Sequence, residues 1–114
     1  MTIQLLEQQE YLKLLDIFKN NPSLTFQNEG YKYIDKNKLT DDDIAKISQI
    51  EEILKKSISG FQKFNNFKLN RKNEPQIRFQ YDWNFDQEVK SIPFIGVGYL
   101  LIDELLNGFK TQKT

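Results

Sequence analysis

Short clusters of acidic side chains are the first feature of the sequence that could carry chemistry, since paired carboxylates serve in acid–base catalysis and in cation binding. Neighbouring side chains on a helix point about 100° apart, so adjacent carboxylates do not converge on one substrate atom. A calcium loop needs ligands at alternate positions and a glycine at its bend, and the acidic run lacks both. We therefore predict no catalytic or metal-binding role for these clusters, which are Asp41-Asp42-Asp43, Asp86 with Glu88, and Asp103 with Glu104.

Histidine and cysteine are both absent from the 114 residues. Their absence removes the commonest general base, the usual nitrogen ligand of zinc, thiol catalysis and disulfides. The run Gly96-Val97-Gly98 lacks the third glycine of a dinucleotide-binding loop, and no Walker lysine follows it. We interpret this run as a bend that lets the last helix pack closely. The sequence thus predicts a protein that is not an enzyme and holds no cofactor.

The overall charge is balanced, but the charge along the chain is not. Sixteen basic and sixteen acidic residues cancel, so no global field attracts the protein to a polyanion or an anionic membrane. Residues 61–80 carry five basic and one acidic side chain, or +4, whereas residues 81–104 carry one basic and five acidic, or −4. Such a local dipole suits docking to a charged patch on another protein.

The longest structured segment is predicted to be a β-hairpin over residues 61–85, turning near residues 71–75. In its second half, apolar and polar residues alternate with the period of a strand that has one buried and one wet face. The apolar row, which we expect in the core, is Ile77, Phe79, Tyr81, Trp83 and Phe85. The polar row, expected on the open face, includes Arg78, Gln80, Asp82 and Asn84.

The remaining elements follow from periodicity and from cap residues. Apolar spacing of three and four predicts a helix over residues 5–18, ended by Asn20-Asn21-Pro22. A short hairpin is expected over residues 24–34, a helix from the Thr40 cap to Gly60, and a last helix over residues 97–107. The prediction is a single α+β domain, residues 1–114, of order αββαββα, whose antiparallel sheet is covered on one face by helices.

Neither end of the chain predicts a membrane segment. The amino terminus, MTIQLLEQQE, has no basic region or cleavage pattern of a signal peptide. The longest apolar run, residues 92–102, is shorter than the roughly 20 residues that cross a bilayer. We therefore expect a cytoplasmic protein.

The segment from Thr40 to Glu88 joins an acidic-capped helix, TDDDIAKISQIEEILKKSI, to a hairpin containing NNFKLNRKNEPQIRFQYDWNFDQE. It resembles the latter half of the YezG-like family of small bacterial immunity proteins, in which a helix leads into a hairpin whose second strand ends in an acidic stretch. Members of that family neutralise secreted nuclease toxins by binding them. The resemblance implies a stoichiometric inhibitor, with Asp82, Asp86 and Glu88 in contact with a basic active site.

The resulting hypothesis is a non-enzymatic inhibitor that binds a protein effector. It would be an immunity protein against a nuclease-type toxin, or a phage-type anti-defence inhibitor such as an anti-CRISPR protein. The predicted partner-binding residues are Arg78, Gln80, Asp82, Asn84, Asp86 and Glu88.

Two alternatives stay open. A small RNA- or DNA-binding module would use the basic hairpin, with Lys68, Arg71, Lys72 and Arg78 on phosphates. The aromatic row argues against it, because side chains needed in the core are not free to stack on bases. The other alternative is a structural subunit or homodimer held together through an exposed part of residues 92–106, including the last helix.

Overall fold

The computed structural model describes residues 3–26, 36–85 and 94–108. Part of the predicted hairpin over residues 24–34, as well as Asp86 and Glu88, lies outside these ranges. The elements in chain order are α1 (Gln8–Asn20), the 3₁₀ turn η1 (Pro22–Leu24), β1 (Thr25–Phe26), η2 (Lys36–Lys38), α2 (Asp41–Ser57), β2 (Phe61–Leu69), β3 (Pro75–Asp82), β4 (Ile95–Leu101) and α3 (Ile102–Asn107).

The α+β class is confirmed, but the predicted order and the purely antiparallel sheet are wrong. The order is αβαβββα, and the four strands lie in the sequence β1-β2-β3-β4 across one mixed sheet. β1 pairs with β2 in parallel, and the other two pairs are antiparallel. α2 connects β1 to β2, and a helical crossover of this kind brings the next strand back in the same direction.

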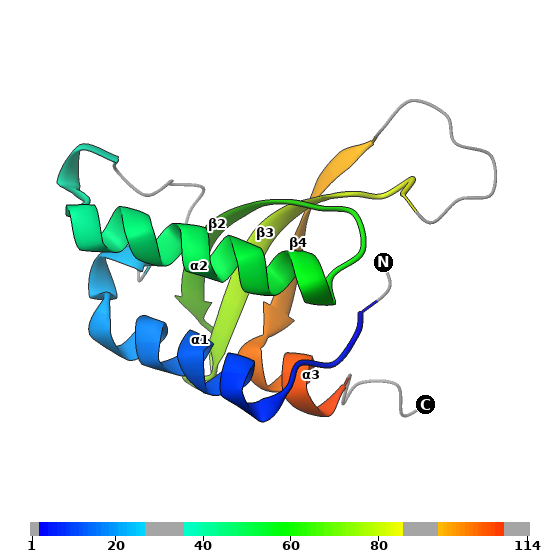
Figure 1. Ribbon diagram of the computed structural model, residues 1–114, viewed down its shortest axis with the longest axis horizontal. Coiled ribbons are helices and arrows are strands. Elements are labelled where there is room, and N and C mark those ends of the chain that lie inside the picture. Colours follow the sequence, from blue (N-terminus) through cyan, green and yellow to red (C-terminus); the bar gives the residue numbers. More distant parts are fainter. Residues whose placement is uncertain (1–2, 27–35, 86–93, 109–114) are drawn as a thin grey trace.

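The helices cover one face of the sheet. Figure 1 shows α1 and α2 side by side over this inner face, with α3 beside α1 at one end of the sheet. The core lies between the two layers, and its largest fully buried side chains include Phe67, Phe79, Leu14, Leu24, Ile50 and Leu54. None of the helices in the described ranges is long and apolar enough to cross a membrane.

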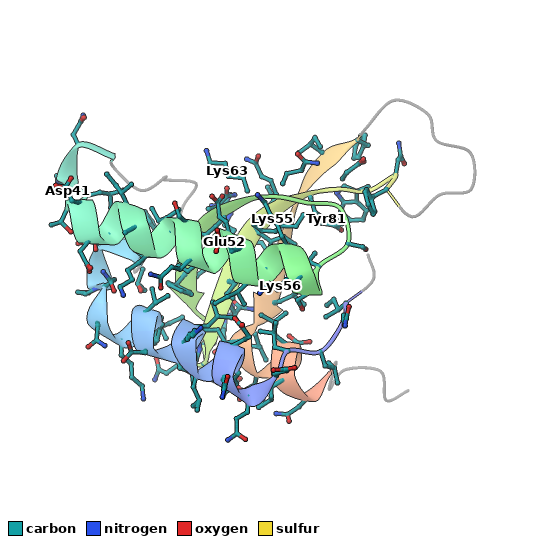
Figure 2. All side chains as sticks on the ribbon, in the orientation of Figure 1. Asp41, Glu52, Lys55, Lys56, Lys63 and Tyr81 are labelled. Carbon is teal, nitrogen blue, oxygen red and sulfur yellow. The ribbon has the colours of Figure 1, made fainter. Side chains whose placement is uncertain are left out.

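α2 begins at the predicted cap, which also joins α2 to α1. The Asp43 amide donates to Thr40 Oγ1 and the Thr40 amide donates to Asp43 Oδ2, both over 3.1 Å. The Asn21 amide nitrogen, at the end of α1, donates to Asp43 Oδ1 over 2.8 Å. The hydrogen bond from Asn21, followed by those from Thr40, holds the pKa of the buried Asp43 carboxyl below its usual range. Figure 2 shows Asp41 at this end of α2 and the basic pair Lys55 and Lys56 at the other, as the helix dipole favours.

The predicted last helix over residues 97–107 is a strand followed by a short helix. β4 occupies residues 95–101, and only Ile102–Asn107 are helical. Gly98 and Gly96 lie opposite Phe79 and Tyr81 on the inner face. A Cβ atom at Gly98 would lie 2.8 Å from Phe79 Cζ, and one at Gly96 would overlap the Trp83 indole. The glycines therefore do not form a bend before a helix; they make room for rings that pack across β4.

The aromatic row of β3 is buried only in part. Ile77, Phe79 and Tyr81 are in the core, as predicted, but Trp83 and Phe85 are each 49% exposed. Both follow the end of β3 and lie past the layer of helices, where Trp83 packs on Gly96 and Phe85 on the turn at Gly60. Placing these two residues in the core was therefore wrong.

A side-chain hydrogen bond joins the first and last helices. The Tyr11 hydroxyl on α1 donates to Asp103 Oδ1 on α3 over 2.5 Å. This bond, with smaller contributions from burial and from the carboxylate charge, raises the pKa of Tyr11 to about 12. The bond secures α3 at a position 92 residues away from Tyr11 in sequence.

Replacing Tyr11 with phenylalanine should lower the free energy of unfolding at pH 7 by about 1 kcal/mol, because it removes a hydrogen bond to a charged acceptor. The difference from wild type should shrink between pH 10.0 and about 12, the range in which the unfolded tyrosine is ionised and the folded one is not. Urea denaturation at several pH values measures this difference in the free energy of unfolding. Tyr99→Phe removes an exposed hydroxyl as the control, and an equal loss in both variants would contradict the assignment.

The two glycines of β4 should respond differently to alanine. Gly98→Ala should cost about 1 to 3 kcal/mol, because the fully buried Phe79 has no space into which it could move. Gly96→Ala should cost less, because it displaces the half-exposed Trp83. Since Trp83 is the only tryptophan, its fluorescence should change in Gly96→Ala and stay near wild type in Gly98→Ala. A larger loss of stability in Gly96→Ala would contradict the packing described for β4.

Candidate functional site

The sheet face opposite the helices, called the outer face below, is the most extensive candidate surface. Side chains of β3 and β4 alternate between the two faces, so residues adjacent to the buried inner row of these strands lie on the outer face. β2 has two register irregularities, and its outer-face residues are those paired with the outer residues of β3. No described helix lies over this face (Figure 1). Its side chains are Lys63, Asn66 and Lys68 from β2, Gln76, Arg78, Gln80 and Asp82 from β3, and Ile95, Val97, Tyr99 and Leu101 from β4.

An apolar row runs along the β4 side of the outer face. Ile95, Val97 and Tyr99 are 48%, 40% and 45% exposed, at every second position of the strand. Side chains of this kind are normally buried when they alternate along a strand. The inner face of the same strand carries Gly96, Gly98 and Leu100, so β4 presents its larger side chains mainly to solvent.

Basic groups gather around Tyr99. The Lys68 Nζ atom and the Arg78 guanidinium carbon each lie 5.8 Å from the centre of the Tyr99 ring, within the range of cation–π attraction. Arg78 is only 7% exposed. The expectation that the whole polar row of β3 is exposed to solvent is therefore wrong at this residue. Arg78 is on the central strand, with Asn66 opposite it on β2 and Tyr99 opposite it on β4. The most exposed basic side chain of the outer face is therefore Lys63 on β2 (Figure 2), whereas Lys68 is half-buried.

The hairpin between β2 and β3 ends in an ordered basic tip. Asn70 Oδ1 accepts hydrogen bonds from the amides of Lys72 and Glu74 over 2.9 and 2.8 Å, which closes the turn. Asn73 adopts a φ of 60°, a conformation that asparagine tolerates better than most residues. Arg71 and Lys72 are exposed at this tip, at the same end of the sheet as Tyr99.

Asp82 has a structural role at the opposite end of the sheet. Its Oδ1 atom accepts from the Asn84 amide over 2.9 Å and from the Phe94 amide over 3.0 Å. The carboxylate thus joins the end of β3 to the chain that enters β4. Of the other predicted partner contacts, Arg78 and Gln80 lie on the outer face, Asn84 follows the end of β3, and Asp86 and Glu88 fall outside the described ranges.

The structure brings together residues that the sequence interpretation had separated. Lys68 and Arg78 were predicted for the nucleic-acid alternative, and both contact Tyr99, which had been assigned to a helix. Ile95 and Val97 were predicted only as part of the range 92–106, for contacts within an assembly. The alternation Ile-Gly-Val-Gly-Tyr at positions 95–99 was the signal available, because a period of two with β-branched residues is typical of a strand.

The helical side of the molecule has fewer features that could form a binding or catalytic site. Shallow hollows of about 120 and 220 Å³ lie between α1, α2 and the amino-terminal segment, and both are lined by Glu10 and Lys56. These two side chains form an ion pair of 3.9 Å at the surface. Within residues 3–26, 36–85 and 94–108, no group of three or more acidic, histidine or cysteine side chains is placed to hold a metal ion.

Comparison of the chain with protein-family models, with curated proteins and with solved structures gives no match.

Proposed function

We propose that this protein acts by binding another protein through the outer face of its sheet. The observation that carries the proposal is the row of exposed apolar side chains on β4, at Ile95, Val97 and Tyr99, on a face that no described helix covers. Protein interfaces commonly combine an apolar centre with a polar rim. Here the rim is made by Lys63, Lys68 and the glutamines of β3.

The charge of this face indicates the kind of partner. Its charged side chains on β2 and in the middle of β3 are Lys63, Lys68 and Arg78, and the tip adds Arg71 and Lys72. Asp82 lies at the far end and already accepts two backbone hydrogen bonds. An acidic or polar patch on the partner would complement the face, and complementary potentials increase the rate and selectivity of association.

The most specific form of the proposal is a stoichiometric inhibitor of a protein effector. The resemblance of residues 40–88 to immunity proteins motivates it, as an antagonist of a nuclease-type toxin or of a defence enzyme. An inhibitor needs a rigid surface, and the outer face belongs to three paired strands backed by a buried core, which hold their side chains in fixed positions. The effector would be blocked through an acidic region rather than through contacts to Asp82.

Reversing the charge of Lys63 and Lys68 together to glutamate should abolish capture of the partner and leave the fold intact. The matched control is Lys13→Glu with Lys55→Glu, which makes the same charge change at exposed positions on α1 and α2. Affinity capture from nuclease-treated lysate of the native source, with quantitative mass spectrometry, compares the three proteins. The partner should be enriched by wild type and control and lost from the outer-face variant, and equal enrichment by all three would refute the outer face.

If the captured partner is an enzyme, titrating the chain against it tests the inhibitor form. Activity should fall in proportion to added protein and reach its minimum at one equivalent, as tight stoichiometric binding requires. If the activity of the enzyme is unchanged at saturation, the chain binds the enzyme but does not inhibit it.

A second candidate function, binding of single-stranded nucleic acid, is favoured by one observation. Tyr99 is exposed on a sheet face with two cations next to its ring, Lys68 and Arg78, and Arg71 and Lys72 lie at the same end. Exposed aromatics on sheets stack with bases, and neighbouring basic groups neutralise phosphates. This arrangement removes the objection that every aromatic side chain of the sheet is needed in the core.

Binding of a labelled single-stranded oligonucleotide should then weaken steeply with salt, with a logarithmic slope of about −2 for three phosphate contacts. Tyr99→Leu should weaken it roughly tenfold by removing the stacked ring while retaining apolar bulk. Fluorescence anisotropy at several salt concentrations measures both effects. A weak signal that is independent of salt and of Tyr99 would exclude this function.

A further inference from the structure

β4 forms one edge of the sheet, and its backbone has a defined set of outward-pointing groups. The Trp83 amide donates to the Phe94 carbonyl over 2.7 Å, so these two residues form a hydrogen-bonded pair next to the end of β3 and the start of β4. Such pairs recur at every second residue of an antiparallel ladder. Gly96, Gly98 and Leu100 therefore bond to β3, whereas the N–H and C=O groups of Ile95, Val97 and Tyr99 point to the free edge.

The sequence of β4 lacks the features that protect an edge strand. Natural proteins protect edges with lysine or other charged side chains, with proline, or with bulges that twist the strand away. β4, with the sequence IGVGYLL, has no charged residue and no proline, and its pairing with β3 shows no register shift. No other described strand lies along this edge. The edge is thus seven uncharged residues long and is suited to accept another strand.

We propose that a second copy of this chain occupies the edge, with β4 paired antiparallel to β4 of the partner copy across a two-fold axis at Val97. This register makes Val97 face Val97 of the other copy and makes Ile95 face its Tyr99. Ile95, Val97 and Tyr99 then all form hydrogen-bonded pairs through their outward-pointing backbone groups, and their side chains continue one apolar row across the axis. A two-fold interface needs such a self-complementary surface.

A hydrogen bond at the end of β4 favours this register over the one centred on Gly98. Centring the axis on Gly98 would pair Ile95 with Leu101 of the other copy and would require the Leu101 amide. That amide already donates to Glu104 Oε1 over 2.9 Å, at the start of α3. Centring on Val97 leaves this bond in place.

The charges of the sheet agree with the antiparallel arrangement. Arg78 lies opposite Tyr99 on the neighbouring strand, and Asp82 lies opposite Ile95. In the paired sheets, the basic end of one copy therefore lies beside the Asp82 end of the other. The groups are about three strand spacings apart, roughly 14 Å, so this attraction is weak and mainly favours the antiparallel direction.

Pairing of this kind leaves the outer face accessible. Neighbouring strands meet through backbone groups, so Lys63, Lys68 and the apolar row stay on the surface of a sheet that is now twice as wide. The dimer does not depend on the proposed function, and the two can fail separately: Lys63→Glu with Lys68→Glu should stay dimeric, since neither lysine is on β4.

Because Val97 would face Val97 of the other copy, one substitution at this position places a charge on both sides of the axis. In Val97→Lys and in Val97→Glu, like charges face each other across the axis, so each variant alone should associate at least about tenfold more weakly than wild type. Mixing the two should restore a dimer containing one copy of each. Light scattering after size exclusion and native mass spectrometry measure the masses. A wild-type monomer at about 100 µM, or variants that dimerise as wild type does, would overturn the proposal.

A cysteine at the same site tests the register independently of charge. Side chains of a hydrogen-bonded pair point to the same face with Cβ atoms roughly 5 Å apart, which is far for a disulfide but within reach of a short thiol-to-thiol cross-linker. Because the chain has no cysteine of its own, Val97→Cys should give a cross-linked dimer with a short bis-maleimide. Leu12→Cys, at an exposed position on α1, is the control and should stay monomeric on a non-reducing gel. Equal cross-linking of both variants, or none at Val97, would refute the Val97 axis.

Discussion

The close packing of β4 on β3 is the constraint on which the rest of the structure depends. Phe79 and Tyr81 lie opposite Gly98 and Gly96 on the inner face. A Cβ atom at Gly98 would clash with the Phe79 ring, and one at Gly96 would clash with the Trp83 indole. Because side chains alternate along a strand, this arrangement sends Ile95, Val97 and Tyr99 to the outer face. The same alternation decides which backbone groups reach the free edge. One steric requirement thus places the apolar row on the outer face and decides which backbone groups of β4 point to the edge of the sheet.

The helices explain why the outer face is left uncovered. α2 crosses over the sheet between β1 and β2, and the hydrogen bonds of Asn21 to Asp42 and Asp43 attach the end of α1 to the start of α2. Tyr11 then connects α1 to α3 through Asp103. All three helices are therefore linked to one another on the side of the core. The described chain has no further helix for the other face, so recognition there is a matter of the sheet alone.

Local signals in the sequence were reliable where one residue type has one physical role. Thr40 forms the predicted cap of α2, and the turn between β2 and β3, at residues 70–74, falls near the predicted residues 71–75. The last predicted helix was wrong because apolar residues over 97–107 satisfy both a helical and an alternating pattern. The room that Gly96 and Gly98 leave for aromatic rings, together with the pairing of β4 with β3, decides in favour of the strand. Neither can be read from the spacing of the apolar residues.

The candidate surface was predicted only in part for a related reason. Arg78 and Gln80 were identified because alternation places them opposite the core row, and Lys68 because of its positive charge in the hairpin. Their neighbour Tyr99 was not, because it comes from a strand about 20 residues further along the chain. The sequence by itself determined the α+β class, the aromatic core of β3 and the absence of histidine and cysteine chemistry. Only the tertiary structure decided the mixed sheet, the exposure of Trp83 and the identity of the outer face, because these depend on which distant segments pair and on how far the helices reach.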